Sequence, residues 1–271
     1  MKKLQFAMVG GGNGALIGDI HRIGAQFDDL AELKAGCFSR HWDKNLEAGE
    51  KWGVEPGRIY PDYHTMLEEE AKRTGEDRLD FVVVATPNNF HCPLVCQALE
   101  AGKTVVCEKP VAMSSEELQV MMDTASRTGS LFTIHQNRRM DADYLLMREA
   151  AEKGTLGKVF EIESRVTGSR GIPEGWRQYK VAGGGMMLDW GVHLIDQLMM
   201  MNPTPVTSVF CDMYHVAYQE CDDGFKLQLK FEDGVMATIE VGTSHYIDAP
   251  RWYVCGNRGT LSIPDWSCNG K

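Results

Sequence analysis

The stretch Val9-Gly-Gly-Gly-Asn-Gly-Ala15 decides the fold of this chain, because it follows a short apolar run and leads into a helical pattern. Gly10, Gly12 and Ala15 fit the Gly-x-Gly-x-x-Gly/Ala spacing. In such a loop the first glycine permits a tight turn, the second lets the backbone approach a pyrophosphate, and the third small residue lets helix and strand pack closely. The N–H groups at the helix start then face the phosphates. The stretch predicts a dinucleotide-binding loop of the Rossmann type, with a plain glycine-rich turn as the alternative.

Outward from this loop, apolar runs and helical stretches alternate through residues 1–135, which is typical of a parallel sheet with crossover helices. The run Phe81–Ala85 is apolar on both faces, as a central parallel strand should be. Ser114 and Glu117 form a capping-box pattern at the start of a helix over Ser114–Arg127. The expected strands are Leu4–Val9, Glu32–Phe38, Phe81–Ala85, Thr104–Cys107 and Leu131–His135. We therefore assign residues 1–135 to a doubly wound α/β dinucleotide-binding domain.

Residues 136–271 have a different pattern, in which apolar and polar residues alternate over several short runs. The expected strands are Val206–Tyr214, Phe225–Phe231, Val235–Val241 and Gly259–Ile263. Glu232-Asp-Gly234 predicts a hairpin turn between two of them, and a helix is expected over Met187–Met201. This half is predicted to be an α+β domain with a large, mainly antiparallel open sheet for substrate binding and oligomerisation.

The composition argues against several classes of partner. The chain has 28 Lys and Arg against 38 Asp and Glu, a net charge of −10, and no basic run, which disfavours a nucleic-acid or anionic membrane surface. Its apolar stretches are too short to span a bilayer, and the start MKKLQFAMVGGG is interpreted as a first strand rather than a signal peptide. The eight cysteines are scattered, which favours reduced thiols in a cytoplasmic protein.

The end of the second expected strand, Cys37-Phe-Ser-Arg40, bears on the type of cofactor. An acidic residue at this place binds the 2′-hydroxyl of NAD, whereas a nearby Arg accepts the 2′-phosphate of NADP. No acid stands here; Ser39 can hydrogen-bond to either group, and Arg40 can pair with a phosphate. We predict NAD or NADP, with NADP slightly favoured, and a solvated loop charge is the alternative role for Arg40.

Three further segments strengthen the case, namely Ala85-Thr-Pro-Asn-Asn-Phe-His91, Cys107-Glu-Lys-Pro110 and Gly183-Gly-Gly-Met-Met-Leu-Asp-Trp-Gly-Val-His193. Together with the glycine loop, in this order and over nearly the whole chain, they resemble the Gfo/Idh/MocA family. The resemblance implies a nicotinamide-dependent oxidoreductase acting on sugars, polyols or related compounds. It also implies a Rossmann domain followed by an α+β domain with an open sheet that often serves oligomerisation.

The resemblance places Lys109 beside the nicotinamide and the substrate, and suggests a cis bond between Lys109 and Pro110. Lys109 comes just past the end of a parallel strand, where ligands of doubly wound sheets bind. A lysine there can polarise the reacting oxygen and move its proton, particularly when burial lowers its pKa. Taken alone, Lys109 would rather be interpreted as a surface lysine before a helix.

Asp189 and His193 are four residues apart and share one face of the expected helix. With Lys109 they form a plausible proton-transfer set, in which His193 is the general base and Asp189 positions substrate hydroxyls. Gly183-Gly-Gly185 permits close approach of the backbone to a ligand. The alternatives are a helix-start Asp189 with a core His193 satisfied by Asp196, or a metal site of these three residues. No further ligand cluster accompanies them, and we predict no metal.

The remaining site residues follow from the same motifs. Cofactor binding is predicted for Gly10, Gly12, Asn13, Ala15, Ser39, Arg40, Thr86, Pro87, Asn88, Glu108 and Lys109. Substrate contacts are predicted for Asn137, Arg138, Trp176 and Arg177, with ordinary loop packing as the alternative for the last two.

Three functions compete on these residues. The first is a dehydrogenase that exchanges NAD(P) and oxidises or reduces a secondary alcohol of a sugar, polyol or glycoside. The second is a redox-neutral sugar-modifying enzyme with tightly bound NAD, and the third is a non-catalytic dinucleotide-binding regulator. The proton-transfer set argues against the third. The sequence ends at Ser267-Cys-Asn-Gly-Lys271, earlier than the family pattern, so the homo-oligomer that we expect depends on a complete second domain.

Overall fold

Five parallel strands build the first half of the chain in the computed structural model, which describes residues 2–268 and 270. They are β1 (Leu4–Gly10), β2 (Ala31–Cys37), β3 (Phe81–Ala85), β4 (Thr104–Glu108) and β5 (Phe132–His135), in the order β2-β1-β3-β4-β5. The apolar run Phe81–Ala85 is the central strand, as predicted, and each expected strand agrees with an observed one within one residue at either end. Contacts divide the chain into two compact units, Met1–His135 and Gln136–Lys271.

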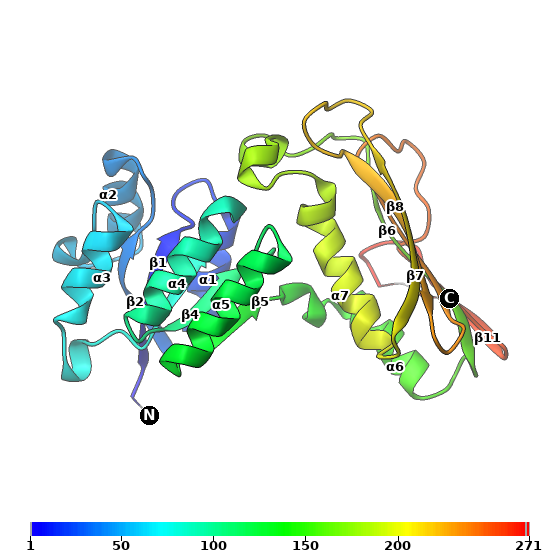
Figure 1. Cartoon of the computed structure of the whole chain (residues 1–271), viewed down its shortest axis with the longest axis horizontal. Helices are drawn as coiled ribbons and strands as arrows, with labels where there is room; N and C mark the ends of the chain where they lie inside the picture. Colours follow the sequence, from blue (N-terminus) through cyan, green and yellow to red (C-terminus); the bar gives the residue numbers. More distant parts are fainter. Residues whose placement is uncertain (1, 269, 271) are drawn as a thin grey trace. The chain divides into compact units, whose positions relative to one another are not determined.

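Helices connect these strands and supply the rest of the first core. They are α1 (Leu16–Gln26), α2 (Trp42–Lys51), α3 (Tyr63–Ala71), α4 (His91–Glu100) and α5 (Ser115–Thr128). Figure 1 shows α4 and α5 lying side by side. The predicted capping pattern of α5 is present, because Ser114 accepts the N–H of Glu117 at 3.2 Å and Glu117 accepts the N–H of Met113 at 2.9 Å. This cap satisfies N–H groups that lack a partner within the helix.

Six strands form the sheet of the second unit in the described part of the chain. They are β6 (Val159–Thr167), β7 (Val206–Tyr214), β8 (Gly224–Phe231), β9 (Met236–Gly242), β10 (Trp252–Gly256) and β11 (Gly259–Ile263), in the order β11-β10-β6-β9-β8-β7. Only the pair β6–β9 is parallel, so the sheet is mainly antiparallel, as predicted. The helices α6 (Ala142–Glu152) and α7 (Val192–Met201) pack their apolar residues against it (Figure 1).

The predicted helix over Met187–Met201 has two parts. Met187–Gly191 forms a π-helical turn, and α7 proper begins at Val192. Such π-helical turns are rare and occur frequently at functional sites. Asp189 therefore lies in the wide turn and His193 in the regular helix.

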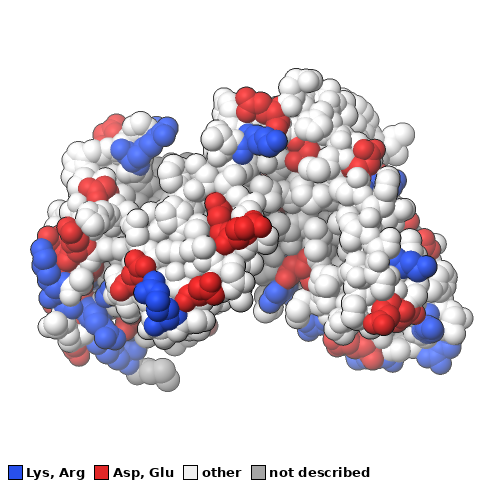
Figure 2. Space-filling view, in the orientation of Figure 1, with Lys and Arg blue, Asp and Glu red and all other residues white. Residues whose placement is uncertain are grey.

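Charged side chains of both signs are mixed on one face of the protein (Figure 2). On the face drawn in Figure 2, Lys and Arg side chains are interspersed with Asp and Glu, and the described residues show no extended basic patch there. Among residues 2–268 and 270, no helix combines the length and apolar character needed to cross a membrane.

Candidate functional site

Two glycines of the loop after β1 are required by the neighbouring strand ends. A Cβ on Gly10 would lie 2.4 Å from the carbonyl oxygen of Ala85, and one on Gly12 would lie 2.6 Å from that of Phe38. Gly10 also has φ +77°, a region that favours glycine. The loop thus runs tightly over the carboxyl ends of the parallel strands, where nucleotides bind in this fold.

The role predicted for the third small residue of the motif was wrong. Ala15 is exposed and stands immediately before α1, so it does not provide the close packing expected of it. Gly18 does so instead, because a Cβ there would lie 1.7 Å from the carbonyl oxygen of Gly11. The seven-residue spacing of these two glycines was the signal that the sequence interpretation missed.

The ribose end of the predicted cofactor site contains polar and basic side chains. Ser39 accepts the N–H of His41 at 3.1 Å, and Arg40 is exposed. Lys51, which the sequence analysis did not single out, places its Nζ 3.5 Å from Oδ1 of Asn13 in the glycine loop. Two cations therefore accompany the loop, one after β2 and one at the end of α2.

The segment after β3 fits a bound polar ligand. Asn88 is only 2% exposed, and Oγ1 of Thr86 is buried without a hydrogen-bond partner among the described residues. Buried hydroxyls in native proteins are normally satisfied, so a donor or acceptor from a ligand suits this position. The glycine loop and Thr86 are thus compatible with a dinucleotide.

His91 ties the Thr86 segment to the Lys109 segment. Its Nδ1 lies 2.8 Å from the carbonyl oxygen of Pro110, and its Nε2 lies 2.9 Å from that of Thr86. The side chain is fully buried, and burial lowers its pKa although both carbonyl contacts oppose this change. The bond between Lys109 and Pro110 is cis, as predicted.

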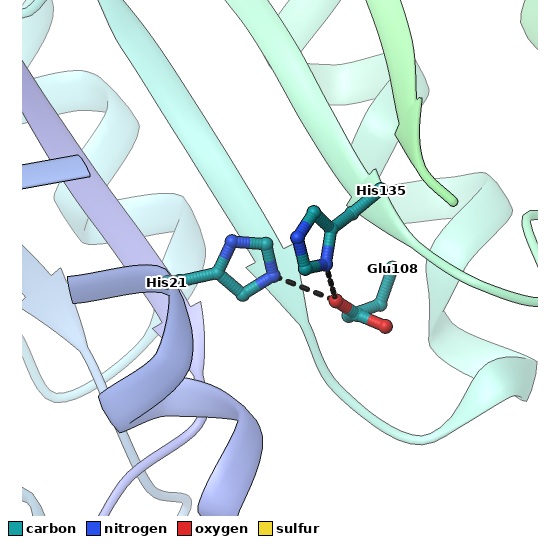
Figure 3. A group of neighbouring side chains, drawn as sticks. All are labelled: His21, Glu108 and His135. Atoms are coloured by element: carbon teal, nitrogen blue, oxygen red, sulfur yellow. Dashed lines mark hydrogen bonds and ion pairs between the residues drawn. The ribbon is translucent and has the colours of Figure 1, made fainter. Parts of the chain in front are cut away.

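Glu108 lies in a buried cluster that the sequence analysis missed. Its Oε1 is 2.7 Å from Nε2 of His21 and 2.6 Å from Nδ1 of His135 (Figure 3), and its Oε2 accepts the N–H of Lys109 at 3.2 Å. Both carboxylate oxygens thus bond within the protein, and the predicted cofactor contact of Glu108 stays a prediction. Among the described residues, His21, Glu108 and His135 are the group whose donor atoms could hold a metal.

The second unit brings Asp189 together with a predicted substrate residue. Nε of Arg177 lies 3.2 Å from Oδ1 of Asp189, and the same guanidinium lies 4.6 Å from the ring centre of Trp176. The glycines before this turn approach protein groups: a Cβ on Gly184 would lie 2.2 Å from the Arg177 carbonyl oxygen, and one on Gly185 would lie 2.2 Å from Asp222. Packing within the protein therefore already requires both glycines, and the approach of this segment to a ligand stays a prediction.

Asp222 is a further residue that the sequence analysis missed. It is 7% exposed, and its Oδ2 accepts the N–H of Met187 at 2.7 Å at the start of the π-helical turn. Burial raises the pKa of this carboxyl. Asp222 thereby holds the turn that carries Asp189.

His193 has a defined hydrogen-bond partner in Gln136. Its Nδ1 lies 2.7 Å from Oε1 of Gln136, whose Nε2 donates to the carbonyl oxygen of Val192 at 3.2 Å. Because that second bond fixes the amide orientation, Nδ1 of a neutral His193 carries the proton and Nε2 carries the lone pair. His193 is 3% exposed.

Asp196, the alternative hydrogen-bond partner expected for His193, has a different partner in the structure. Asp196 bonds instead to Arg139, at 2.7 and 2.6 Å. Arg138, a predicted substrate residue, lies 4.1 Å from the ring centre of Trp190, whose ring is 6.0 Å from that of His193. Asn137 is partly buried in the same turn. The convergence of Lys109, from the first unit, with this second-unit cluster stays a prediction.

Comparisons with known proteins cover both halves of the chain. Residues 4–136 match the model of an oxidoreductase family with an NAD-binding Rossmann fold (GFO_IDH_MocA), and residues 144–262 match the GFO/IDH/MocA C-terminal domain. The chain is 30% identical to the uncharacterized oxidoreductase YfiI of Bacillus subtilis, over 96% of this chain and 70% of that protein.

Solved structures give the same result. An NAD-binding protein from Listeria innocua is 44% identical, with a TM-score of 0.90 over 100% of this chain and 73% of that chain. An inositol dehydrogenase homolog from Azotobacter vinelandii, complexed with NADH and myo-inositol, is 27% identical, with a TM-score of 0.85 over 99% of this chain and 72% of that chain. The chain thus spans about 70% of the length of each of these three relatives.

Proposed function

This chain belongs to the GFO/IDH/MocA family of NAD-binding oxidoreductases, and we propose that it transfers a hydride between NAD(P) and a secondary alcohol of a sugar, polyol or glycoside. The observation that carries the proposal is the bond between His193 and Gln136, which leaves the lone pair of the neutral imidazole on Nε2. A histidine in that tautomer suits removal of an alcohol proton.

The first unit holds the dinucleotide. The glycine loop and the start of α1 receive the pyrophosphate, since backbone N–H groups there favour anions. Thr86 offers its buried hydroxyl and Asn88 its amide after β3. When bound, the nicotinamide supplies the hydride acceptor or donor.

The second unit holds the hydroxylated substrate. Arg177 keeps Asp189 in place at 3.2 Å, and Asp189 accepts substrate hydroxyls. His193 takes the proton from the reacting hydroxyl, and Lys109 stabilises the oxygen that carries the developing charge. The Azotobacter relative with bound myo-inositol supports a polyol-sized substrate.

A substrate survey tests the proposal. The purified chain is mixed with NAD or NADP and each of myo-inositol, glucose and methyl glucosides, and formation of the reduced dinucleotide is followed. We expect reduction with at least one member, and a rate about 10²–10⁴-fold lower with the Lys109→Met variant. Dinucleotide that stays bound through purification and does not exchange would instead favour the redox-neutral function.

We also propose self-association through the second unit. The edge strand β7 exposes Val209 and Phe210, each 63% exposed, and an exposed apolar edge strand favours pairing with another chain. Sedimentation of the wild type and of a Phe210→Glu variant tests this. A wild type that is monomeric at high concentration contradicts it.

A further inference from the structure

We propose that three histidines, His21, His91 and His135, are positioning residues for Lys109, because they hold the residues on both sides of it. His21 and His135 fix the Glu108 carboxylate, which in turn bonds the N–H of Lys109, and His91 fixes the carbonyl of Pro110. The inference rests on the proposed role of Lys109 in proton transfer.

The carboxylate side of this arrangement joins three elements. His21 comes from α1, Glu108 from the end of β4 and His135 from the end of β5, and both imidazoles point at the same oxygen of Glu108 (Figure 3). The ring centres of the two histidines are 4.2 Å apart. His21 and Glu108 are 8% and 6% exposed, so water competes little for the bond between them, whereas the His135 side chain is 27% exposed.

The distances at the Glu108 carboxylate are those of hydrogen bonds. Ligands about 2.0–2.2 Å from a tetrahedral zinc lie roughly 3.3–3.6 Å from one another. The observed separations of 2.7 and 2.6 Å are shorter and match charge-assisted N–H···O bonds. Burial opposes ionisation of Glu108, but the bonds from His135 and His21 outweigh it and hold the pKa at about 2. The bridge is therefore an ionised carboxylate between two N–H donors.

The carbonyl side joins the two loops at the strand ends. His91 faces the carbonyl oxygens of Pro110 and Thr86 at 2.8 and 2.9 Å, and its side chain is fully buried. A neutral imidazole donates to one of them at a time, whereas the imidazolium donates to both. His91 thus contacts both the Lys109 segment and the Thr86 segment proposed to contact the cofactor, and as imidazolium it bonds both.

Rigid backbone at this point matters because the lysine side chain is flexible. Its ammonium ends a four-carbon stem, so its direction depends on a fixed Cα position. Proton transfer needs its groups within hydrogen-bond reach, and a misplacement of about 1 Å can cost roughly 10²-fold in rate. Loss of one histidine donor should therefore lower kcat.

Matched variants test this. In His21→Gln the amide nitrogen replaces Nε2, and in His135→Asn it replaces Nδ1, so both keep a donor to Glu108; His21→Leu and His135→Leu remove it. We expect kcat to fall at least about tenfold in the Leu variants, by the geometric argument. The Gln and Asn variants should stay within about threefold of wild type, with KM and the dinucleotide Kd little changed in all four.

Hydrogen exchange of the Lys109 amide gives a readout that does not depend on the proposed reaction. The Lys109 amide should exchange faster in the Leu variants than in His21→Gln and His135→Asn. If the Leu variants fail to fold, Glu108→Gln takes their place in this comparison. A protein with no dehydrogenase activity but with this exchange pattern would refute the proposed function and support the backbone-fixing step. Equal exchange in all variants, or Leu variants with wild-type kcat, would overturn the inference. The inference would also be overturned if the purified protein contained one equivalent of a transition metal and the His21→Gln variant lacked it.

Discussion

Nδ1 of His193 lies 2.7 Å from Oε1 of Gln136, the first residue after the parallel sheet. This bond sets the tautomer of the proposed general base. Replacing Gln136 with Leu removes the acceptor, so the imidazole can adopt either tautomer and rotate. We expect kcat to fall about tenfold or more, within the range of acid–base contributions, with little change in dinucleotide affinity. Gln136→Glu keeps an acceptor for Nδ1 and serves as the control; equal kcat losses in both variants would contradict this role.

The basic residues near the glycine loop should decide between the two dinucleotides. Arg40 is exposed after β2, and Lys51 lies 3.5 Å from Asn13. Charge-assisted bonds to a 2′-phosphate contribute about 1.5–3 kcal/mol, so Arg40→Ala or Lys51→Ala should weaken NADP binding about tenfold or more and NAD binding much less. Fluorescence titration of both dinucleotides measures this, with exposed Lys44→Ala as the control. Equal losses for the two dinucleotides, or a wild type that prefers NAD, would refute the preference.

Replacing each of two glycines of α1 with alanine should change the free energy of unfolding in opposite directions. A Cβ on Gly18 would overlap the Gly11 carbonyl, whereas one on Gly24 would meet nothing within 4 Å. Gly24→Ala should stabilise the protein by about 0.5–1 kcal/mol through helix propensity. Gly18→Ala should destabilise it by about 1–3 kcal/mol, as overpacking does. Urea unfolding measures both; similar values for the two variants would show that the α1–loop contact is not tight.

Glu108 should make stability depend on acidity. Its pKa falls from 4.5 when unfolded to about 2 when folded, so the carboxylate stabilises the fold fully above pH 4.5 and loses this effect as the pH falls toward 2. The difference corresponds to about 3 kcal/mol. Urea unfolding between pH 6 and pH 3 should show a shallower loss for Glu108→Gln than for wild type. Parallel pH profiles would indicate that Glu108 is not ionised between the two histidines.

Much of the fold follows from local sequence patterns. The strand Phe81–Ala85 is exact because its apolar run lies between the polar residues Asp80 and Thr86, and Val206–Tyr214 is also exact, starting directly after Pro205. The strands β6 and β10 and the helix α6 were not predicted. The apolar pattern of β6 is interrupted by the charged residues Glu161, Glu163 and Arg165. In addition, β6 pairs with β9, which lies far away in the sequence.

The candidate site was predictable only where a motif carried it. Lys109, Asp189 and His193 came from segments with a recognisable pattern, whereas the partners that fix them did not. Gln136 is 57 residues from His193, and His21 is 87 residues from Glu108. Such pairs depend on the order of strands in the sheet, which no local spacing reveals.

The central claim is hydride transfer with proton transfer by Lys109 and His193. Its most direct test is incubation of the protein with NAD or NADP and carbon-deuterated polyols and sugars, including myo-inositol, followed by mass analysis of the dinucleotide. The account predicts one deuterium on the reduced nicotinamide for at least one substrate. Lys109→Met and His193→Ala should lower the rate about 10²–10⁴-fold while still binding the dinucleotide. Absence of deuterium transfer with every substrate, or near-normal rates in both variants, would contradict it.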